Sequence, residues 1–185
     1  MTTDDLCVGF FAACWAEGLM DLPPGARVLE VGCAEGDWVT PMREVRPDLQ
    51  ITALDWRRIE RPGATVVQAD VLTWAPPHLF DAIVSVSAIE HIGLGAYDAD
   101  PLDADGDSHA IARMGSWLAP GGWLYCDVPY RPAGPYVVGS NYRAYDPDQL
   151  AARLVRPSGL GVRHQRIFEA QHPDAPYVAL VLAHS

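Results

Sequence analysis

The sequence predicts an α/β protein with a doubly wound, Rossmann-like, seven-stranded sheet that is mostly parallel. Short segments rich in Val, Ile and Leu alternate with segments of helical spacing along most of the chain. This alternation is typical of parallel sheets that helices cover on both faces. The first apolar segment, RVLEV, ends at a turn bracketed by Gly32 and Gly36, the kind of corner where such sheets bind nucleotides. The last two apolar segments follow each other directly, which predicts a C-terminal antiparallel strand pair.

The N-terminal half begins with a helical pattern and continues with strands. The N-terminal segment, residues 1–22, is expected to form a helix that ends before Pro23. Its residues 4–19 have the apolar spacing of an amphipathic helix. Residues 27–32 form the first strand, and 37–49 carry large apolar residues at helical spacing. Further strands are expected at 50–55, 64–70 and 80–91.

The C-terminal half repeats this order. A helix is expected over 108–122, where Pro120 and two glycines close it, and a strand over 122–130. The next helix covers 146–155, with Asp146 or Asp148 near its cap. The antiparallel pair should occupy 162–170 and 176–183. We see no repeat and no linker, so residues 1–185 are expected to form a single domain.

Composition restricts the function. The formal net charge of −11 argues against binding to nucleic acid or to an anionic membrane. All 13 basic residues are arginine, which excludes Schiff-base chemistry and a phosphate-loop lysine. Cys7, Cys14, Cys33 and Cys126 have neither CxxC nor zinc spacing, which favours reduced thiols. The N-terminus lacks a basic leader segment, and no apolar run is long enough to span a bilayer, so we expect a cytoplasmic location.

Acidic residues stand at three consecutive expected strand ends. Glu30 precedes the glycine turn, Asp55 ends the second strand, and Asp70 ends the third. An acid about 20 residues beyond such a turn can accept hydrogen bonds from both hydroxyls of a ribose. Trp56 offers a flat face for stacking, and the Val71 backbone would face an adenine ring. Each residue also has a structural explanation, since Asp often caps turns and Gly is needed at tight corners.

Taken together, five motifs resemble those of class I S-adenosylmethionine-dependent methyltransferases. They are ExGxxxG at 30–36, the acid at 55, AD at 69–70, FDAIVSVSAIEH at 80–91 and LAPGGWL at 118–124. Ala34 stands where that family often has glycine. The resemblance implies S-adenosyl-L-methionine as cofactor and S-adenosylhomocysteine as product. The cofactor-binding residues that it implies are Glu30, Gly32, Ala34, Gly36, Asp55, Trp56, Asp70, Val71 and Ser87.

A narrower resemblance begins at the fourth expected strand. The segments SAIEHIGLGAYDADPLDADGD and NYRAYDPDQL are similar to those of a small methyltransferase-like family with an EHIGLG…DxDGD segment. Ala96 stands where arginine is expected in that family. This resemblance implies a fold and a cofactor but no particular acceptor.

Glu90 and His91 are the expected catalytic residues. Both are expected at the end of the fourth strand, which the resemblance places beside the transferred methyl group. A histidine there can take a proton from an attacking hydroxyl or amine. A histidine that only bonds the backbone at the strand end is the alternative.

Two further segments are expected on the acceptor side. The acidic segment between Asp98 and Asp107 fits a solvated, helix-capping loop, and a magnesium site or a polar acceptor site are the alternatives. The Pro/Gly-rich segment 129–146 fits an acceptor lid or an oligomer contact. We expect no bound metal, and the expected acceptor-binding residues are Tyr97, Asp98, Tyr130 and Arg143.

The function that follows is methyl transfer to oxygen or nitrogen of a small polar acceptor, sugar-like or a natural product. Neither nucleic acid nor membrane is an expected partner, and a homodimer stays open. A non-catalytic S-adenosylmethionine-binding subunit of a larger enzyme is the main alternative, because the cofactor motifs would look the same. A nicotinamide-dependent oxidoreductase is disfavoured, since the chain has no lysine for a Tyr-Lys pair.

Overall fold

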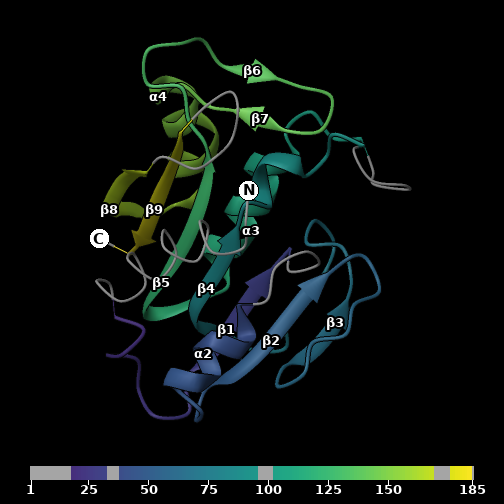
Figure 1. Cartoon of the computed structure of the whole chain (residues 1–185), viewed down its shortest axis with the longest axis vertical. Helices are drawn as coiled ribbons and strands as arrows, with labels where there is room; N and C mark the ends of the chain where they lie inside the picture. The colour runs from purple at the N-terminus through teal and green to yellow at the C-terminus, as the bar shows by residue number, and fades with distance from the viewer. Residues whose placement is uncertain (1–17, 33–37, 96–101, 169–175, 185) are drawn as a thin grey trace.

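The computed structural model describes residues 18–32, 38–95, 102–168 and 176–184. Seven strands form its main sheet (Figure 1). They are β1 (Arg27–Val31), β2 (Gln50–Asp55), β3 (Thr65–Gln68), β4 (Phe80–Val86), β5 (Leu118–Pro129), β8 (Gly161–Phe168) and β9 (Tyr177–Ala183). Their order across the sheet is β3-β2-β1-β4-β5-β9-β8.

The directions of the strands confirm the predicted fold class. Parallel pairing joins β3, β2, β1, β4 and β5, and β9 runs antiparallel to both β5 and β8. The chain therefore forms a Rossmann-like sheet with a C-terminal antiparallel pair. The strand order reverses between β1 and β4, and doubly wound sheets bind ligands beyond the carboxyl ends of the strands at such a position.

Helical segments cover both faces of the sheet. They are α2 (Val39–Val45), α3 (Gly106–Ser116) and a continuous run of α4 (Pro147–Leu150), the π-helical η2 (Ala151–Val155) and α5 (Arg156–Ser158). α3 ends earlier than the predicted 122 because β5 already begins at Leu118 and pairs there with Phe80 of β4. The predicted helix at 4–19 lies outside the described residues.

Alternation along the strands divides the core into two layers. In β1, Val28 packs with Met42 of α2 in one cluster, whereas Leu29 packs with Ile111 of α3 in the other. Neighbouring strand residues point to opposite faces, so a central strand with apolar residues on both sides is buried completely. The central strands thereby form a rigid base for the segments that leave their carboxyl ends.

The fourth strand is shorter than predicted. β4 ends at Val86, and Ser87 has a φ of 45°, in the left-handed region that extended strands do not use. Residues Ile89–His91 form a short 3-10 helix, η1. The prediction that Glu90 and His91 end a strand is wrong, because the backbone turns at Ser87 and places both beyond the sheet edge. Similarly, β3 ends at Gln68, so Asp70 lies in the following turn.

The segment 129–146 is not an open loop. It contains a small antiparallel hairpin of β6 (Val137–Val138) and β7 (Arg143–Ala144). Tyr145 is tied to the end of β5, since its N–H donates to the Pro129 carbonyl at 2.9 Å. In Figure 1 this hairpin lies beyond the ends of the central strands.

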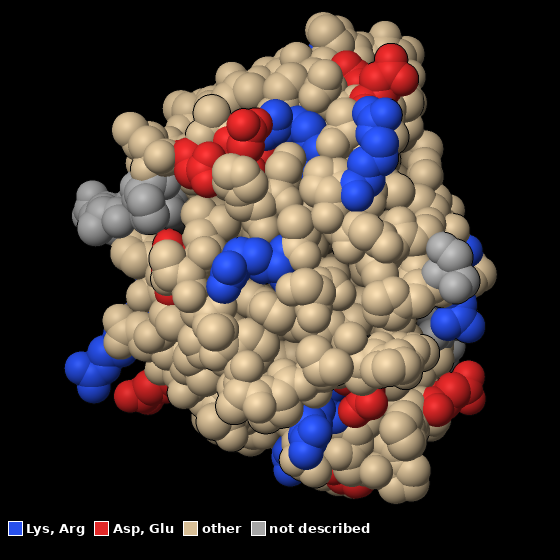
Figure 2. All heavy atoms as spheres, turned by 180° about the vertical axis from the view of Figure 1, so that it is seen from behind, with Lys and Arg blue, Asp and Glu red and all other residues tan. Residues whose placement is uncertain are grey.

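The surface and the helices give two further observations. On the face shown in Figure 2, arginine and acidic side chains form small groups of both signs with uncharged side chains between them. None of the helices in the described ranges is long and apolar enough to cross a membrane.

Candidate functional site

The candidate site starts where β1 and β4 end side by side. Gly32 follows β1 with a φ of 78°, and a Cβ on it would lie 2.4 Å from the Cβ of Ala88. Any larger residue would separate the two strand ends. The Gly32 N–H also donates to the Leu54 carbonyl at 2.9 Å, which joins the end of β2 to the same edge. Glu30, two residues earlier, is buried.

Asp55 supplies a buried carboxylate at the end of β2. Its side chain is 1% exposed. The Arg57 backbone N–H donates to its Oδ1 at 2.8 Å, and the Arg57 guanidinium Nε lies 3.2 Å from the same oxygen. Trp56 lies between these two residues, and its carbonyl accepts a hydrogen bond from Gln68 at 3.3 Å. The predicted carboxylate therefore lies at the carboxyl end of β2, with a guanidinium bonded to it.

Asp70 and Val71 lie in a turn after β3. Asp70 Oδ1 accepts from the Leu72 N–H at 2.8 Å, so this side chain caps its own turn. Arg113 of α3 holds the turn in place, because its Nε donates to the Val71 carbonyl at 2.9 Å and its Nη2 donates to the Trp74 carbonyl. The sequence-based reasoning missed Arg113, since only the fold brings it to this turn.

Ser87 connects β4 to β5 and β9. Its backbone N–H donates to Asp127 Oδ1 at 2.8 Å. Its hydroxyl donates to Glu90 Oε1 at 2.8 Å and lies 3.2 Å from the Tyr177 hydroxyl. The Tyr125 hydroxyl donates to the other Asp127 oxygen at 2.6 Å. These bonds hold Ser87 in its left-handed conformation, which is costly for a residue with a side chain.

Two buried carboxyl groups therefore lie behind the strand ends. Glu90 and Asp127 are both inaccessible to solvent. Burial raises the pKa of Glu90 from 4.5 to about 7. Burial, with the charge of Glu90 adding to it, raises the pKa of Asp127 to about 7 as well. Of the two Glu90 oxygens, Oε2 has no hydrogen-bond partner among the described residues. At neutral pH the pair thus holds protons that ordinary carboxyl groups would have lost.

His91 follows Glu90 in η1 and is fixed by the hairpin. Its Nδ1 bonds the carbonyl oxygen of Asn141, just before β7. Because a carbonyl can only accept, Nδ1 has the proton and Nε2 is the basic nitrogen of the neutral ring. The side chain is 22% exposed, and Nε2 lies 3.7 Å from Glu90 Oε1. The two predicted catalytic residues are therefore neighbours, with one ring nitrogen able to accept a proton.

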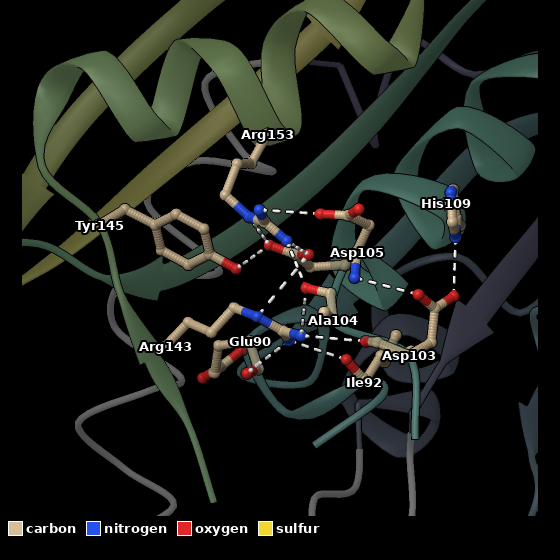
Figure 3. A network of polar contacts seen from close by, with 10 residues as sticks. Glu90, Ile92, Asp103, Ala104, Asp105, His109, Arg143, Tyr145 and Arg153 are labelled. Atoms are coloured by element: carbon tan, nitrogen blue, oxygen red, sulfur yellow. Dashed lines mark hydrogen bonds and ion pairs between the residues drawn. The ribbon is translucent and has the colours of Figure 1, made fainter. Parts of the chain in front are cut away.

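Two of the predicted acceptor-binding residues lie in the interior. Arg143 is 1% exposed, and its donors bond protein carbonyls and approach Asp107 (Figure 3). Tyr130 is 5% exposed, at the end of β5, with its N–H bonded to the Pro176 carbonyl. The prediction that Arg143 binds the acceptor directly is not supported by this placement, because a buried guanidinium with protein partners has no surface to offer.

The acidic segment is divided between the surface and the interior. Asp107 is buried and accepts hydrogen bonds from Arg153 at 2.6 and 2.9 Å and from Tyr145 at 2.8 Å. Asp103 instead bonds His109 at 2.7 Å, as Figure 3 shows. Within the described ranges, no group of three or more His, Cys, Asp or Glu residues is arranged to hold a metal. The predicted site residues Ala34, Gly36, Tyr97 and Asp98 lie outside those ranges.

The order and the directions of the seven strands are those of a class I methyltransferase fold. The chain belongs to the methyltransferase domain family, whose model matches residues 10–173. Both findings confirm the family resemblance that was identified from the five motifs.

Solved structures of similar fold include several methyltransferases. One is the N-methyltransferase NodS of Bradyrhizobium japonicum WM9 in complex with S-adenosyl-L-homocysteine. Its TM-score is 0.66 at 17% sequence identity, and the alignment covers 97% of this chain and 87% of the NodS chain. Another is 1,6-didemethyltoxoflavin-N1-methyltransferase of Burkholderia thailandensis, with a TM-score of 0.67 at 16% sequence identity. The alignment covers 97% of this chain and 88% of the chain of that enzyme. At these identities the likeness establishes the fold.

Curated relatives match a part of the chain. Trans-aconitate 2-methyltransferase of Acidovorax sp. (strain JS42) is 27% identical over 114 residues, which are 58% of this chain and 40% of that protein. Ribosomal RNA large subunit methyltransferase E of Desulfatibacillum aliphaticivorans is 29% identical over 117 residues, 58% of this chain and 56% of that protein. The alignments thus span about half the length of these relatives.

The buried carboxyl pair predicts an unusual pH dependence of stability. Because the folded state raises the pKa of Glu90 from 4.5 to about 7, it binds this proton more tightly than the unfolded state does. The resulting stabilisation is complete below pH 4.5 and is lost as the pH rises through 7. Glu90→Gln cannot lose it, so the free energy of unfolding of the variant relative to wild type should rise by on the order of 2 kcal/mol from pH 4.5 to 8.

Urea denaturation of both proteins across this pH range measures the difference. Asp127, Tyr177, His91 and Arg143 lie around Glu90 and are kept in the variant. Because the charge of Glu90 helps to raise the pKa of Asp127, its removal also lowers that pKa, which changes the stability difference in the same direction. Glu60→Gln, at an exposed glutamate, is the matched control and should show no such trend. A difference for Glu90→Gln that does not change with pH would contradict the prediction.

Proposed function

We propose that this protein is an S-adenosylmethionine-dependent methyltransferase that acts on oxygen or nitrogen of a small polar acceptor, sugar-like or a natural product. The main support is the buried Asp55 carboxylate, which lies at the carboxyl end of β2 on the same edge as Gly32. Membership of the methyltransferase domain family gives this arrangement its chemical meaning.

The residues at this edge fit the cofactor. The Gly32 turn leaves room for backbone to approach a ligand, and the Asp55 carboxylate suits a pair of ribose hydroxyls. The Arg57 guanidinium, which now bonds Asp55, marks the place where such donors would bind. Val71 and Asp70, in the turn fixed by Arg113, would border the adenine, and Ser87 and Trp56 complete the expected set. S-Adenosylmethionine, when bound, supplies a methyl group on a positively charged sulfur.

The work left to the chain is to hold the acceptor and remove its proton. Nucleophilic attack on the methyl group requires a lone pair on the acceptor oxygen or nitrogen, and the acceptor gives up one proton. His91 Nε2 would take this proton, since Nδ1 is already protonated and bonded to Asn141. The ionised form of Glu90, whose Oε1 lies 3.7 Å from Nε2, would stabilise the resulting imidazolium, and this form gains population as the pH rises through 7. Alignment of acceptor and methyl group would supply most of the rate enhancement.

A small acceptor agrees with charge and with the named neighbours. The net charge of −11 would repel nucleic acid, although one relative is a ribosomal RNA methyltransferase. The names of two neighbours of similar fold state N-methyltransferase activity, one of them on 1,6-didemethyltoxoflavin. The main alternative is a non-catalytic cofactor-binding subunit, which would bind S-adenosylhomocysteine equally well. Turnover of a His91→Gln variant separates the two functions.

Cofactor binding is expected to depend on Asp55. Asp55→Ala removes the carboxylate for the ribose, and the loss of charge-assisted hydrogen bonds should cost about 2–3 kcal/mol. Affinity for S-adenosylhomocysteine should fall about 30- to 150-fold by titration calorimetry. Asp48→Ala is the matched control, because Asp48 also pairs with an arginine, Arg46, but precedes β2 at the opposite edge. Equal affinities of Asp55→Ala and wild type would overturn the proposed cofactor site.

His91 should be required for turnover but not for cofactor binding. His91→Gln removes the base, so turnover should fall about 10²- to 10⁴-fold. The decline of the wild-type rate at acidic pH, where an imidazole base becomes protonated, should disappear in the variant. Affinity for S-adenosylhomocysteine should change less than threefold, as the predicted ribose contact belongs to β2.

Methyl transfer from labelled S-adenosylmethionine to a panel of small amines and polyols measures this effect. His109→Gln is the control, since His109 bonds Asp103 on the surface and lies outside η1. If His91→Gln kept wild-type turnover and pH profile, His91 would be structural and the assignment of a general base would be wrong.

A further inference from the structure

Arg143 joins two stretches of backbone, residues 90–92 and residues 103–104, through hydrogen bonds to their carbonyls. Its Nη1 donates to the Ile92 carbonyl at 2.7 Å and to the Glu90 carbonyl at 3.3 Å. Its Nη2 donates to the carbonyls of Ala104 at 3.2 Å and Asp103 at 3.4 Å. One buried guanidinium thus joins the backbone of η1 to the backbone that leads into α3 (Figure 3).

These two backbone stretches pack without space between them. A Cβ on Gly93 would lie 2.2 Å from the Asp103 carbonyl oxygen, and one on Gly106 would lie 2.8 Å from the Ile92 carbonyl oxygen. The Asp103 N–H also donates to the Gly93 carbonyl at 2.9 Å. Such close packing turns several carbonyls toward one interior point, where each needs a donor. Arginine, with five N–H groups in a rigid plane, is the side chain that can supply them together.

The same hairpin also fixes the ring of His91. Asn141, whose carbonyl accepts the proton of His91 Nδ1, precedes Arg143 by two residues. The hairpin itself is anchored to the sheet, because Tyr145 bonds Pro129 at 2.9 Å and the Arg131 N–H bonds the Tyr145 carbonyl at 2.7 Å. The orientation of His91 and the position of its backbone therefore depend on one anchored piece of chain.

We infer that Arg143 is a positioning residue: by holding η1 against the hairpin, it keeps the His91 proton on Nδ1 and leaves Nε2 as the base. This inference rests on the proposed function and gives Arg143 a role other than the predicted contact with the acceptor. It also implies that Gly93 and Asp103, which lie on either side of residues 94–102, stay together while the acceptor binds.

Arg153 provides a matched control within the same network. Arg153 bonds the Asp107 carboxylate and the Ala104 carbonyl. Arg143 also bonds the Ala104 carbonyl and lies close to the Asp107 carboxylate. Its bonds lead to residues 104–107, and no bond from it to residues 90–92 occurs in the described structure. Loss of either arginine should therefore lower stability, but only loss of Arg143 should release η1.

The test compares Arg143→Met, Arg143→Lys and Arg153→Met in the full chain by ¹⁵N NMR of the histidine rings, with His91→Gln to assign the His91 signals. In wild type and Arg153→Met, His91 should show one tautomer, protonated at Nδ1. In both Arg143 variants it should show a mixture with the Nε2-protonated tautomer. Arg143→Lys keeps the charge near Asp107 but cannot bond four carbonyls, so it remains informative if Arg143→Met does not fold.

Kinetics supply the second readout. Both Arg143 variants should lose about 10- to 100-fold in kcat, because misplacement of a base by about 1 Å costs this much. S-Adenosylhomocysteine affinity should change less than threefold, and Arg153→Met should keep kcat within threefold. Identical His91 spectra and kcat in the Arg143 and Arg153 variants would overturn the inference.

The NMR result is independent of catalysis, so two failures can be told apart. A tautomer change confined to the Arg143 variants, with full turnover in His91→Gln, would support positioning and refute the general base. A single wild-type tautomer in every variant, with low turnover in His91→Gln, would refute positioning and support the proposed function.

Discussion

The contact between Gly32 and Ala88 is the constraint on which the rest of the site depends. It brings the ends of β1 and β4 together, and no side chain fits between them. The chain after β4 must then turn sharply, which places Ser87 in the left-handed region and aims its N–H at Asp127 of β5. The Gly32 N–H binds the end of β2 in the same way. Four parallel strands are thus joined at one edge by backbone geometry before any ligand is considered.

Buried polar groups then fix the segments that pack beyond this edge of the sheet. A buried charge such as that of Asp107 is costly inside a protein, and pairing offsets the cost only when every partner is present. Asp107 has three partners, of which Arg143 lies in β7, Tyr145 directly follows β7, and Arg153 lies in η2. The network therefore specifies one arrangement of α3, the hairpin and the C-terminal helical run.

Local sequence patterns predicted the sheet and the position of Asp55 at a strand end, but not the contacts around His91. Neighbouring apolar residues such as Val28 and Leu29, which pack in different core clusters, can be recognised as a strand from the local sequence. An acidic residue at a strand end, such as Asp55, can be recognised in the same way. The end of β4 was misjudged because the apolar run continues past Ser87 and nothing in it announces a positive φ. Asp107 and Arg143 are 36 residues apart in the sequence, so only the fold reveals their pairing. Asp127 had one unused signal, an acid inside the apolar strand WLYCDVP.

The difference between the residues that local sequence predicts and those that only the fold reveals has a physical origin. The predicted cofactor residues follow strand ends whose positions are set by the central sheet, so sequence changes elsewhere leave them in place. The surroundings of His91 are set by side chains and carbonyls from the β6–β7 hairpin and the entry to α3, which pack beyond the sheet. A change in the hairpin would alter the acceptor side without disturbing β1 or β2. Under the proposed function, acceptor choice and base orientation would both depend on the hairpin, whereas the predicted ribose contact of Asp55 lies on β2, away from it.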